Sequence, residues 1–175
     1  MGDQSEQQQK NEYSGAALTS FIVALADSKG IVDKLLADAG VESIDPEAWY
    51  DYDWAVSFFY KIEAQLGKAA IASVGRSMIE AAVYPPEIDG VKALLASLGH
   101  WFALNARGPE VGTILCEFED DHSAIIDNSA RGPCSLNIGI IEAACARYGT
   151  VPLIEHGTEG CKDDGAPTCI YRVSW

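Results

Sequence analysis

Helical spacing of apolar residues dominates the first two thirds of the chain. The first such run is Leu18, Phe21, Ile22 and Leu25. Intervals of three and four predict a helix over residues 16–29, which Gly30 would end. Further helices are predicted over residues 32–39, over 54–66 with Asp53 as its cap, over 69–83, and over 91–106 with Asp89 as its cap. Gly75, inside the fourth helix, indicates close backbone packing.

The period then changes from helical to alternating. Residues 112–119 and 122–127 read as two strands, residues 134–148 as a helix, and residues 151–155 and 170–175 as two final strands. Helices segregated from a small antiparallel sheet indicate an α+β fold. We therefore expect an N-terminal helical layer packed on a roughly four-stranded antiparallel sheet. One domain would cover residues 13–175, after a polar, Gln-rich, disordered tail over residues 1–12.

The composition of the chain narrows the range of binding partners that we expect. Apolar residues make up 48% of the chain, but no apolar run approaches the roughly 20 residues of a membrane helix. The net charge of −14 and the scattered Lys and Arg residues disfavour nucleic acid and anionic membranes as partners. The polar N-terminus does not resemble a signal peptide, so we expect a cytoplasmic protein with reduced thiols.

Motifs of common enzymes are absent from the sequence. It contains no Gly-x-Gly-x-x-Gly, no P-loop, no Gly-x-Ser-x-Gly and no His-Glu-x-x-His. The carboxylates between Glu117 and Asp121 are better explained as a solvated turn than as an acid–base pair. The sequence therefore predicts a protein that is not an enzyme.

Cys161 and Cys169 flank a turn-forming run that contains Asp-Asp-Gly-Ala-Pro. This run predicts a hairpin loop with one thiol at each foot. Cys134 opens the preceding helix, so three thiols can converge at one corner of the sheet, as a metal site, as a redox pair, or as reduced thiols that merely pack together. Cys116 and Cys145 fall on apolar faces and are expected in the core.

A zinc site made of these thiols needs a fourth ligand, because structural zinc is tetrahedral. The candidates just before Cys161 are His156, Glu159 and Glu155. Neighbouring residues of a strand face opposite ways, so the register of the strand decides which of them points inward.

Aromatic residues are dense in two helical segments. The candidates for the lining of an apolar ligand pocket are Trp54, Phe58, Trp101 and Phe102. The alternative is ordinary packing at two helix–helix contacts.

The C-terminal segment resembles the 4-vinyl-reductase domain family. The matching features are a Cys-x4-Gly helix start at Cys134, a Gly-x-x-Pro strand entry at Gly149, and Cys-x7-Cys from Cys161 to Cys169 with Gly and Pro inside, followed by an aromatic strand. Asp-Pro-x-x-Trp-Tyr from Asp45 is a weaker match in the first half. The resemblance implies the fold shared by heme–nitric-oxide-binding domains and by small subunits of the TRAPP vesicle-tethering complex.

The resemblance also implies two cofactors to be tested. In phenol-sensing members of the family, three cysteines and a glutamate hold a structural zinc, and Cys134, Cys161 and Cys169 match those thiols. The glutamate position is occupied here by Thr158, so His156, Glu159 or Glu155 would have to substitute.

The heme-binding relatives suggest the second cofactor. They carry a proximal histidine on the helix before the sheet, where this chain has His100. They also carry a Tyr-x-Ser-x-Arg motif, of which Ser129 and Arg131 remain while Asp127 replaces the tyrosine. These three positions define the heme alternative.

Taken together, the residues and the resemblance predict a sensor domain that binds a hydrophobic small molecule and signals to a partner protein in trans. By analogy with the relatives, a homodimer is expected. Two alternatives are a heme-based gas sensor using His100 and a ligand-free interaction scaffold similar to the vesicle-tethering subunits.

Overall fold

The computed structural model describes residues 10–175; the tail predicted over residues 1–12 falls mostly outside this range. The helices are α1 (Gly15–Val23), η1 (Ala26–Ser28), α2 (Lys29–Asp38), α3 (Tyr52–Leu66), α4 (Lys68–Ala81), α5 (Val91–Asn105), α6 (Cys134–Ala146) and the 3₁₀ turn η2 (Lys162–Asp164). The order of helices and strands follows the sequence-based prediction over most of the chain.

The first predicted helix is too long. The helix α1 ends at Val23, because the backbone N–H of Leu25 bonds to the carbonyl of Ile22 in a tight turn that buries Leu25 in the core. Gly30 does not end a helix but lies inside α2, where a side chain would meet open space. Helices α1 and η1–α2 are therefore two segments bent by 80°.

Two predicted helix caps are also displaced. Asp51, not Asp53, caps α3, and its Oδ1 accepts a hydrogen bond of 2.8 Å from the backbone N–H of Trp54. Gly90, not Asp89, precedes α5, and it offers no side-chain cap. Asp53 lies in the first turn of α3 and pairs with Arg131 instead.

The predicted four-stranded antiparallel sheet is present, with the order β4-β5-β7-β6. Its strands are β4 (Ile114–Phe118), β5 (Ser123–Asn128), β6 (Leu153–His156) and β7 (Cys169–Ser174). The α+β class is thereby confirmed. A small second sheet, β2-β1-β3, was not predicted; it joins β1 (Glu12–Ser14), β2 (Trp49–Asp51) and β3 (Ala106–Arg107). These strands of two and three residues are too short to show an alternating pattern.

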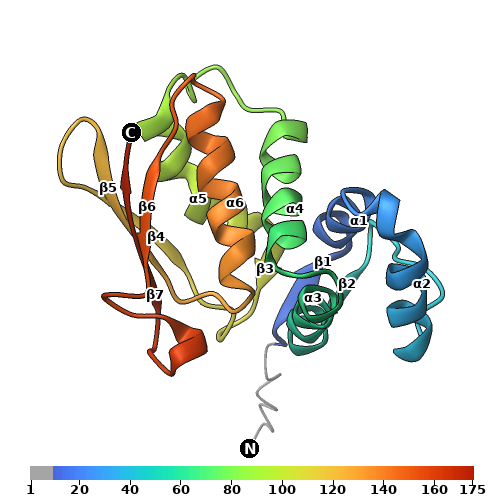
Figure 1. Ribbon diagram of the computed structural model, residues 1–175. Coiled ribbons are helices and arrows are strands. Elements are labelled where there is room, and N and C mark those ends of the chain that lie inside the picture. Colours follow the sequence, from blue (N-terminus) through green and yellow to red (C-terminus); the bar gives the residue numbers. More distant parts are fainter. Residues whose placement is uncertain (1–9) are drawn as a thin grey trace, which may run out of the picture.

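The helices form successive layers beside the four-stranded sheet. Figure 1 shows α5 and α6 next to this sheet, α4 beyond α6, and the blue and teal helices α1–α3 on the far side of α4. One hydrophobic core lies between the sheet and helices α5 and α6, and a second lies among α1–α4. The helices that cover the sheet are thus the later ones, while α1–α3 pack against α4.

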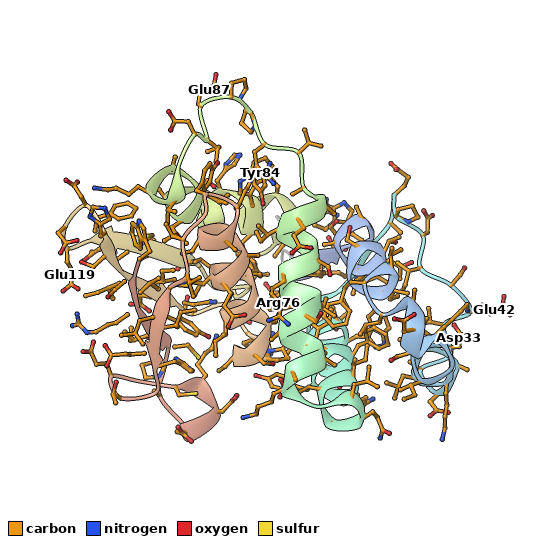
Figure 2. The ribbon with its side chains drawn as sticks, turned by 45° about the horizontal axis from the view of Figure 1, so that its top comes forward. Asp33, Glu42, Arg76, Tyr84, Glu87 and Glu119 are labelled. Atoms are coloured by element: carbon orange, nitrogen blue, oxygen red, sulfur yellow. The ribbon has the colours of Figure 1, made fainter. Side chains whose placement is uncertain are left out.

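Two glycines allow α4 and α6 to pack backbone against backbone. A Cβ at Gly75 would collide with the carbonyl oxygen of Leu136 on α6, and a Cβ at Gly139 would collide with the carbonyl oxygen of Ala72 on α4. This confirms the close packing predicted at Gly75. Figure 2 shows Arg76 at the same interface, where it forms a 2.7 Å ion pair with Glu142 of α6.

Among residues 10–175, no single helix is both long enough and apolar enough to cross a membrane. Only the bent pair of α1 with η1–α2 meets the criteria of length and composition, and only when its two parts are counted together.

Candidate functional site

Three cysteines and one histidine converge at one end of the four-stranded sheet. Cys134 is the first residue of α6, Cys161 directly precedes η2, Cys169 begins β7, and His156 ends β6. Their three sulfurs and one imidazole nitrogen all lie within 4.8 Å of one another. The three thiols are buried. The sequence separated these residues by up to 35 positions, and the hairpin and the start of α6 bring them together as predicted.

The distances between the sulfurs distinguish a metal site from a disulfide. Cys134 Sγ lies 3.6 Å from Cys161 Sγ and 3.5 Å from Cys169 Sγ. A disulfide needs about 2.05 Å between sulfurs. Zinc with Zn–S bonds of about 2.3 Å in a tetrahedron separates its sulfurs by about 3.8 Å. The observed spacing is close to the tetrahedral edge and far from a covalent bond.

His156 is oriented like a metal ligand. Its Nδ1 lies 2.9 Å from the backbone carbonyl oxygen of Ile170, a contact that favours the tautomer with the proton on Nδ1. Its Nε2 is buried and has no hydrogen-bond partner within residues 10–175. The ring stacks on Tyr171 with centroids 4.2 Å apart, which fixes its orientation. A lone pair on Nε2 is therefore available to an electrophile.

The carboxylate candidates lie elsewhere. Glu159 Oε1 accepts a 2.6 Å hydrogen bond from Arg172 Nε on the outer face of the sheet. Glu155 is exposed, because it alternates with the inward-facing His156 along β6. Of the five predicted metal-site residues, the structure brings together the three cysteines and His156, and it places Glu159 in an ion pair.

Burial sets the protonation of the cluster. Desolvation raises the pKa of the Cys134 thiol, and the hydrogen-bonding thiols of Cys169 and Cys161 raise it further. Without a bound metal ion the Cys134 thiol is therefore held neutral. A bound divalent cation would reverse this balance, since a coordinating thiol is deprotonated.

A cavity of about 540 Å³ lies between α1, α4, α5, α6 and the inner face of the sheet. Its lining is mostly apolar and includes Trp101 and Phe102, as the sequence predicted. Trp54 and Phe58, the other two predicted lining residues, lie outside it. They stack on each other with centroids 5.5 Å apart in the core among α1–α4, so ordinary packing accounts for them.

The cavity carries a few polar side chains that the sequence analysis did not single out. Asn128 of β5 and Thr19 of α1 line it, and each has a buried oxygen without a hydrogen-bond partner in the described part of the chain. Tyr13 and Tyr84 also line it, and burial raises the pKa of both phenols. Tyr84, which is labelled in Figure 2, follows the end of α4. Its ring meets the ring of Trp101 edge-on, with centroids 5.7 Å apart.

One signal in the sequence could have identified Asn128. The inward-facing positions of β5 are Ala124, Ile126 and Asn128, so an amide ends an otherwise apolar face. A polar residue at a buried strand position needs a partner.

The cavity and the thiol–histidine cluster share a wall. Tyr171 lines the cavity with its ring and stacks on His156 of the cluster. Ala130 lines the cavity as well, and its carbonyl oxygen accepts a hydrogen bond from Lys162 Nζ, next to Cys161. A structural change at either site can therefore affect the other through Tyr171 or through Ala130 and Lys162.

The three residues of the heme alternative are placed apart from the cavity or are already engaged. His100 is exposed and lines a separate hollow of about 450 Å³ on the other side of α5. Ser129 Oγ accepts a 2.9 Å hydrogen bond from the backbone N–H of Thr113. Arg131 reaches the cavity wall, but its guanidinium forms an ion pair with Asp53.

No histidine lines the cavity, and all three histidines of the chain lie within the described residues. No cysteine lines it either, and all five cysteines lie within residues 10–175. The residues around the cavity therefore do not fit a heme held by an axial histidine or thiolate.

Comparison with known proteins identifies the fold. No protein-family model and no curated protein matches the chain. Solved structures do match. An H-NOX protein from S. oneidensis in the Fe(II)NO ligation state has a TM-score of 0.70 and 15% identity, over 92% of this chain and 98% of that one. An unliganded Fe(II) H-NOX protein mutant from K. algicida has a TM-score of 0.70 and 14% identity, over 92% and 95%.

A third structure, from work on heme distortion in the H-NOX family, has a TM-score of 0.72 and 18% identity, over 93% of this chain and 94% of that one. The predicted relationship to heme–nitric-oxide-binding domains is thus confirmed at the level of the fold. The narrower resemblance to the 4-vinyl-reductase family stays a prediction. From β1 to β7, the chain has the H-NOX fold.

Proposed function

We propose that the chain is a non-catalytic sensor domain whose interior cavity binds a predominantly apolar small molecule. The observation that carries this proposal is the cavity itself. Its volume of about 540 Å³ falls in the range of small-molecule sites, and its wall combines apolar side chains with a few neutral polar groups. The cavity is partly open to solvent, and a ligand would bury apolar side chains that otherwise face water.

The sensor acts on a partner protein in trans, and it assembles as a homodimer by analogy with the family it resembles. The five reduced thiols suit a cytoplasmic location.

We further propose a structural zinc held by Cys134, Cys161, Cys169 and His156. The buried Nε2 of His156, the tetrahedral spacing of the sulfurs, and the carbonyl that orients the imidazole support this donor set. Such an ion would join α6, β6 and both feet of the hairpin, and it would hold Tyr171 at the cavity wall. Zinc content by plasma mass spectrometry tests the proposal, and a ratio far below one per chain after purification without chelators contradicts it.

A heme-based gas sensor is the second candidate. It is favoured by the solved neighbours, of which one is described with Fe(II)NO ligation and another with heme distortion. The side chains around the cavity argue against it, since none is a histidine. An absorption spectrum after incubation with heme separates the two candidates.

The apolar-ligand proposal is tested with a probe and a matched pair of variants. Dibenzofuran is a flat apolar molecule without a hydrogen-bond donor, and its binding is measured by equilibrium dialysis. In Ser77→Phe a benzyl group projects from a cavity-lining position of α4, so dibenzofuran binding should be lost. In Ser73→Phe the same change is made one turn earlier, at an exposed position outside the cavity, and binding should be retained. Equal binding by the two variants would refute the proposed site.

A further inference from the structure

Among residues 10–175, Asn128 is the most deeply buried amide side chain on the cavity wall. It ends β5, with Ile114 of β4 on one side and Cys169 of β7 on the other. Its side chain faces inward, and only 2% of the residue is exposed. It lines the cavity on the side next to the thiol–histidine cluster.

The amide oxygen of Asn128 has no hydrogen-bond partner among residues 10–175. Buried polar atoms in folded proteins are nearly always paired, since an unpaired one loses its hydration without compensation. The neighbouring asparagines of the cavity wall follow the rule. Asn105 Nδ2 donates to the carbonyl oxygen of Trp101 at 2.9 Å, and Asn137 Nδ2 donates to Tyr171 Oη at 3.3 Å. The oxygens of these two amides are not among the buried, unpaired atoms of residues 10–175, so Asn128 differs from them in having a buried acceptor without a partner.

The charges around the cavity favour a neutral occupant. Among residues 10–175, Arg131 is the one Lys, Arg, Asp, Glu or His residue in the lining, and its guanidinium forms an ion pair with Asp53. A ligand with a net charge would lose its hydration without gaining an opposite charge. A neutral donor such as an N–H or O–H group would instead complete the hydrogen bonding of Asn128.

We infer that the ligand of this cavity is a neutral, largely apolar molecule that carries an N–H or O–H donor, and that Asn128 Oδ1 accepts the hydrogen bond from this donor. The inference rests on the proposed function, because it concerns the occupant of the same cavity. It adds the chemical feature by which the ligand is selected. Asn128 is then the residue that sets specificity, while the apolar wall supplies most of the affinity.

Carbazole and dibenzofuran test this inference as a matched pair of probes. They have the same shape, but carbazole has an N–H donor where dibenzofuran has an oxygen atom. An unsatisfied buried acceptor is worth enough that the wild-type protein should bind carbazole about tenfold more tightly than dibenzofuran in equilibrium dialysis. Asn128→Leu should abolish this preference by weakening carbazole alone. Asn105→Leu removes an asparagine amide that is already partnered, and it should keep the preference.

The outcomes distinguish a failure of the role of Asn128 from a failure of the proposed function. Equal affinity of wild-type protein for the two probes overturns the role of Asn128 and leaves the proposed function standing. A preference that persists in Asn128→Leu does the same. Absence of binding for both probes overturns the proposed function and the inference with it. The wild-type comparison needs no variant, so the inference can still be refuted if Asn128→Leu fails to fold.

Discussion

Replacing Gly139 with alanine tests how closely α4 and α6 must pack. The new Cβ would overlap the carbonyl oxygen of Ala72, and it would lie 2.7 Å from the carbonyl carbon and 2.9 Å from the Cα of the same residue. These are backbone atoms of a helix, so relief requires the two helices to move apart. Overpacking of this kind costs about 1–3 kcal/mol or more. The helix propensity of alanine offsets about 1 kcal/mol of that cost.

The expected net loss is therefore up to about 2 kcal/mol of unfolding free energy. For a chain of this length it corresponds to a fall in Tm of up to about 4–8 °C. Urea denaturation and thermal melting measure the two quantities. Because both helices line the cavity, the variant should also bind dibenzofuran more weakly.

Gly30→Ala provides the matched control. It makes the same change in α2, where the new methyl group meets open space. Because alanine has a higher helix propensity than glycine, Gly30→Ala should raise the free energy of unfolding by up to about 1 kcal/mol. A Gly139→Ala protein that melts at or above the temperature of the Gly30→Ala protein would refute the close packing of α4 and α6.

The remaining predictions concern the cysteines and the coupling of the two sites. Cys161→Ser should lose the zinc and several kcal/mol of stability, and a chelator should then leave its Tm unchanged. Cys116→Ser should keep the zinc, and a chelator should still lower its Tm. His156→Ala should lower the zinc-to-protein ratio, and Glu159→Gln should leave it unchanged; the opposite pattern would assign the fourth ligand to the carboxylate. Burial raises the pKa of Cys145 from 9.0 to about 11, so the neutral thiol stabilises the fold fully below pH 9.0, and this contribution is lost as the pH rises toward 11. Unfolding free energies measured across that range should fall more steeply for the wild-type protein than for Cys145→Ala, and parallel curves would exclude the burial effect. Zinc should tighten dibenzofuran binding, which titrations with and without zinc can check, and by linkage dibenzofuran then tightens zinc binding by the same factor; a dibenzofuran affinity that zinc leaves unchanged would exclude coupling of the two sites.

The sequence predicted the elements more reliably than their contacts. Periodicity placed α3 to α6 and the four strands, because each has a long enough run of period 3.6 or 2. It missed β1–β3, whose pairing is a long-range event between segments of two and three residues. It extended α1 past its true end because Leu25 fits the helical spacing and yet turns inward after a tight bend.

The convergence of the three thiols could be predicted from the sequence because it depends on a short hairpin. Turn chemistry predicted the hairpin and the convergence of its two thiols. Alternation along β6 showed that Glu155 and His156 face opposite ways, but only the coordinates decided which of His156, Glu159 and Glu155 points inward. The residues that line the cavity could not be predicted in this way. Trp54 and Trp101 both lie in aromatic-rich helices, and only the packing of α3 against α2 and of α5 against α6 and β4 decides which of them borders empty space.

The most direct test of the account is the absorption spectrum of the protein after incubation with heme and removal of the unbound pigment. We expect no stoichiometric Soret band, because no histidine among residues 10–175 lines the cavity. We also expect the protein to bind dibenzofuran in that cavity. One heme per chain with a Soret band that His100→Ala abolishes would contradict the account.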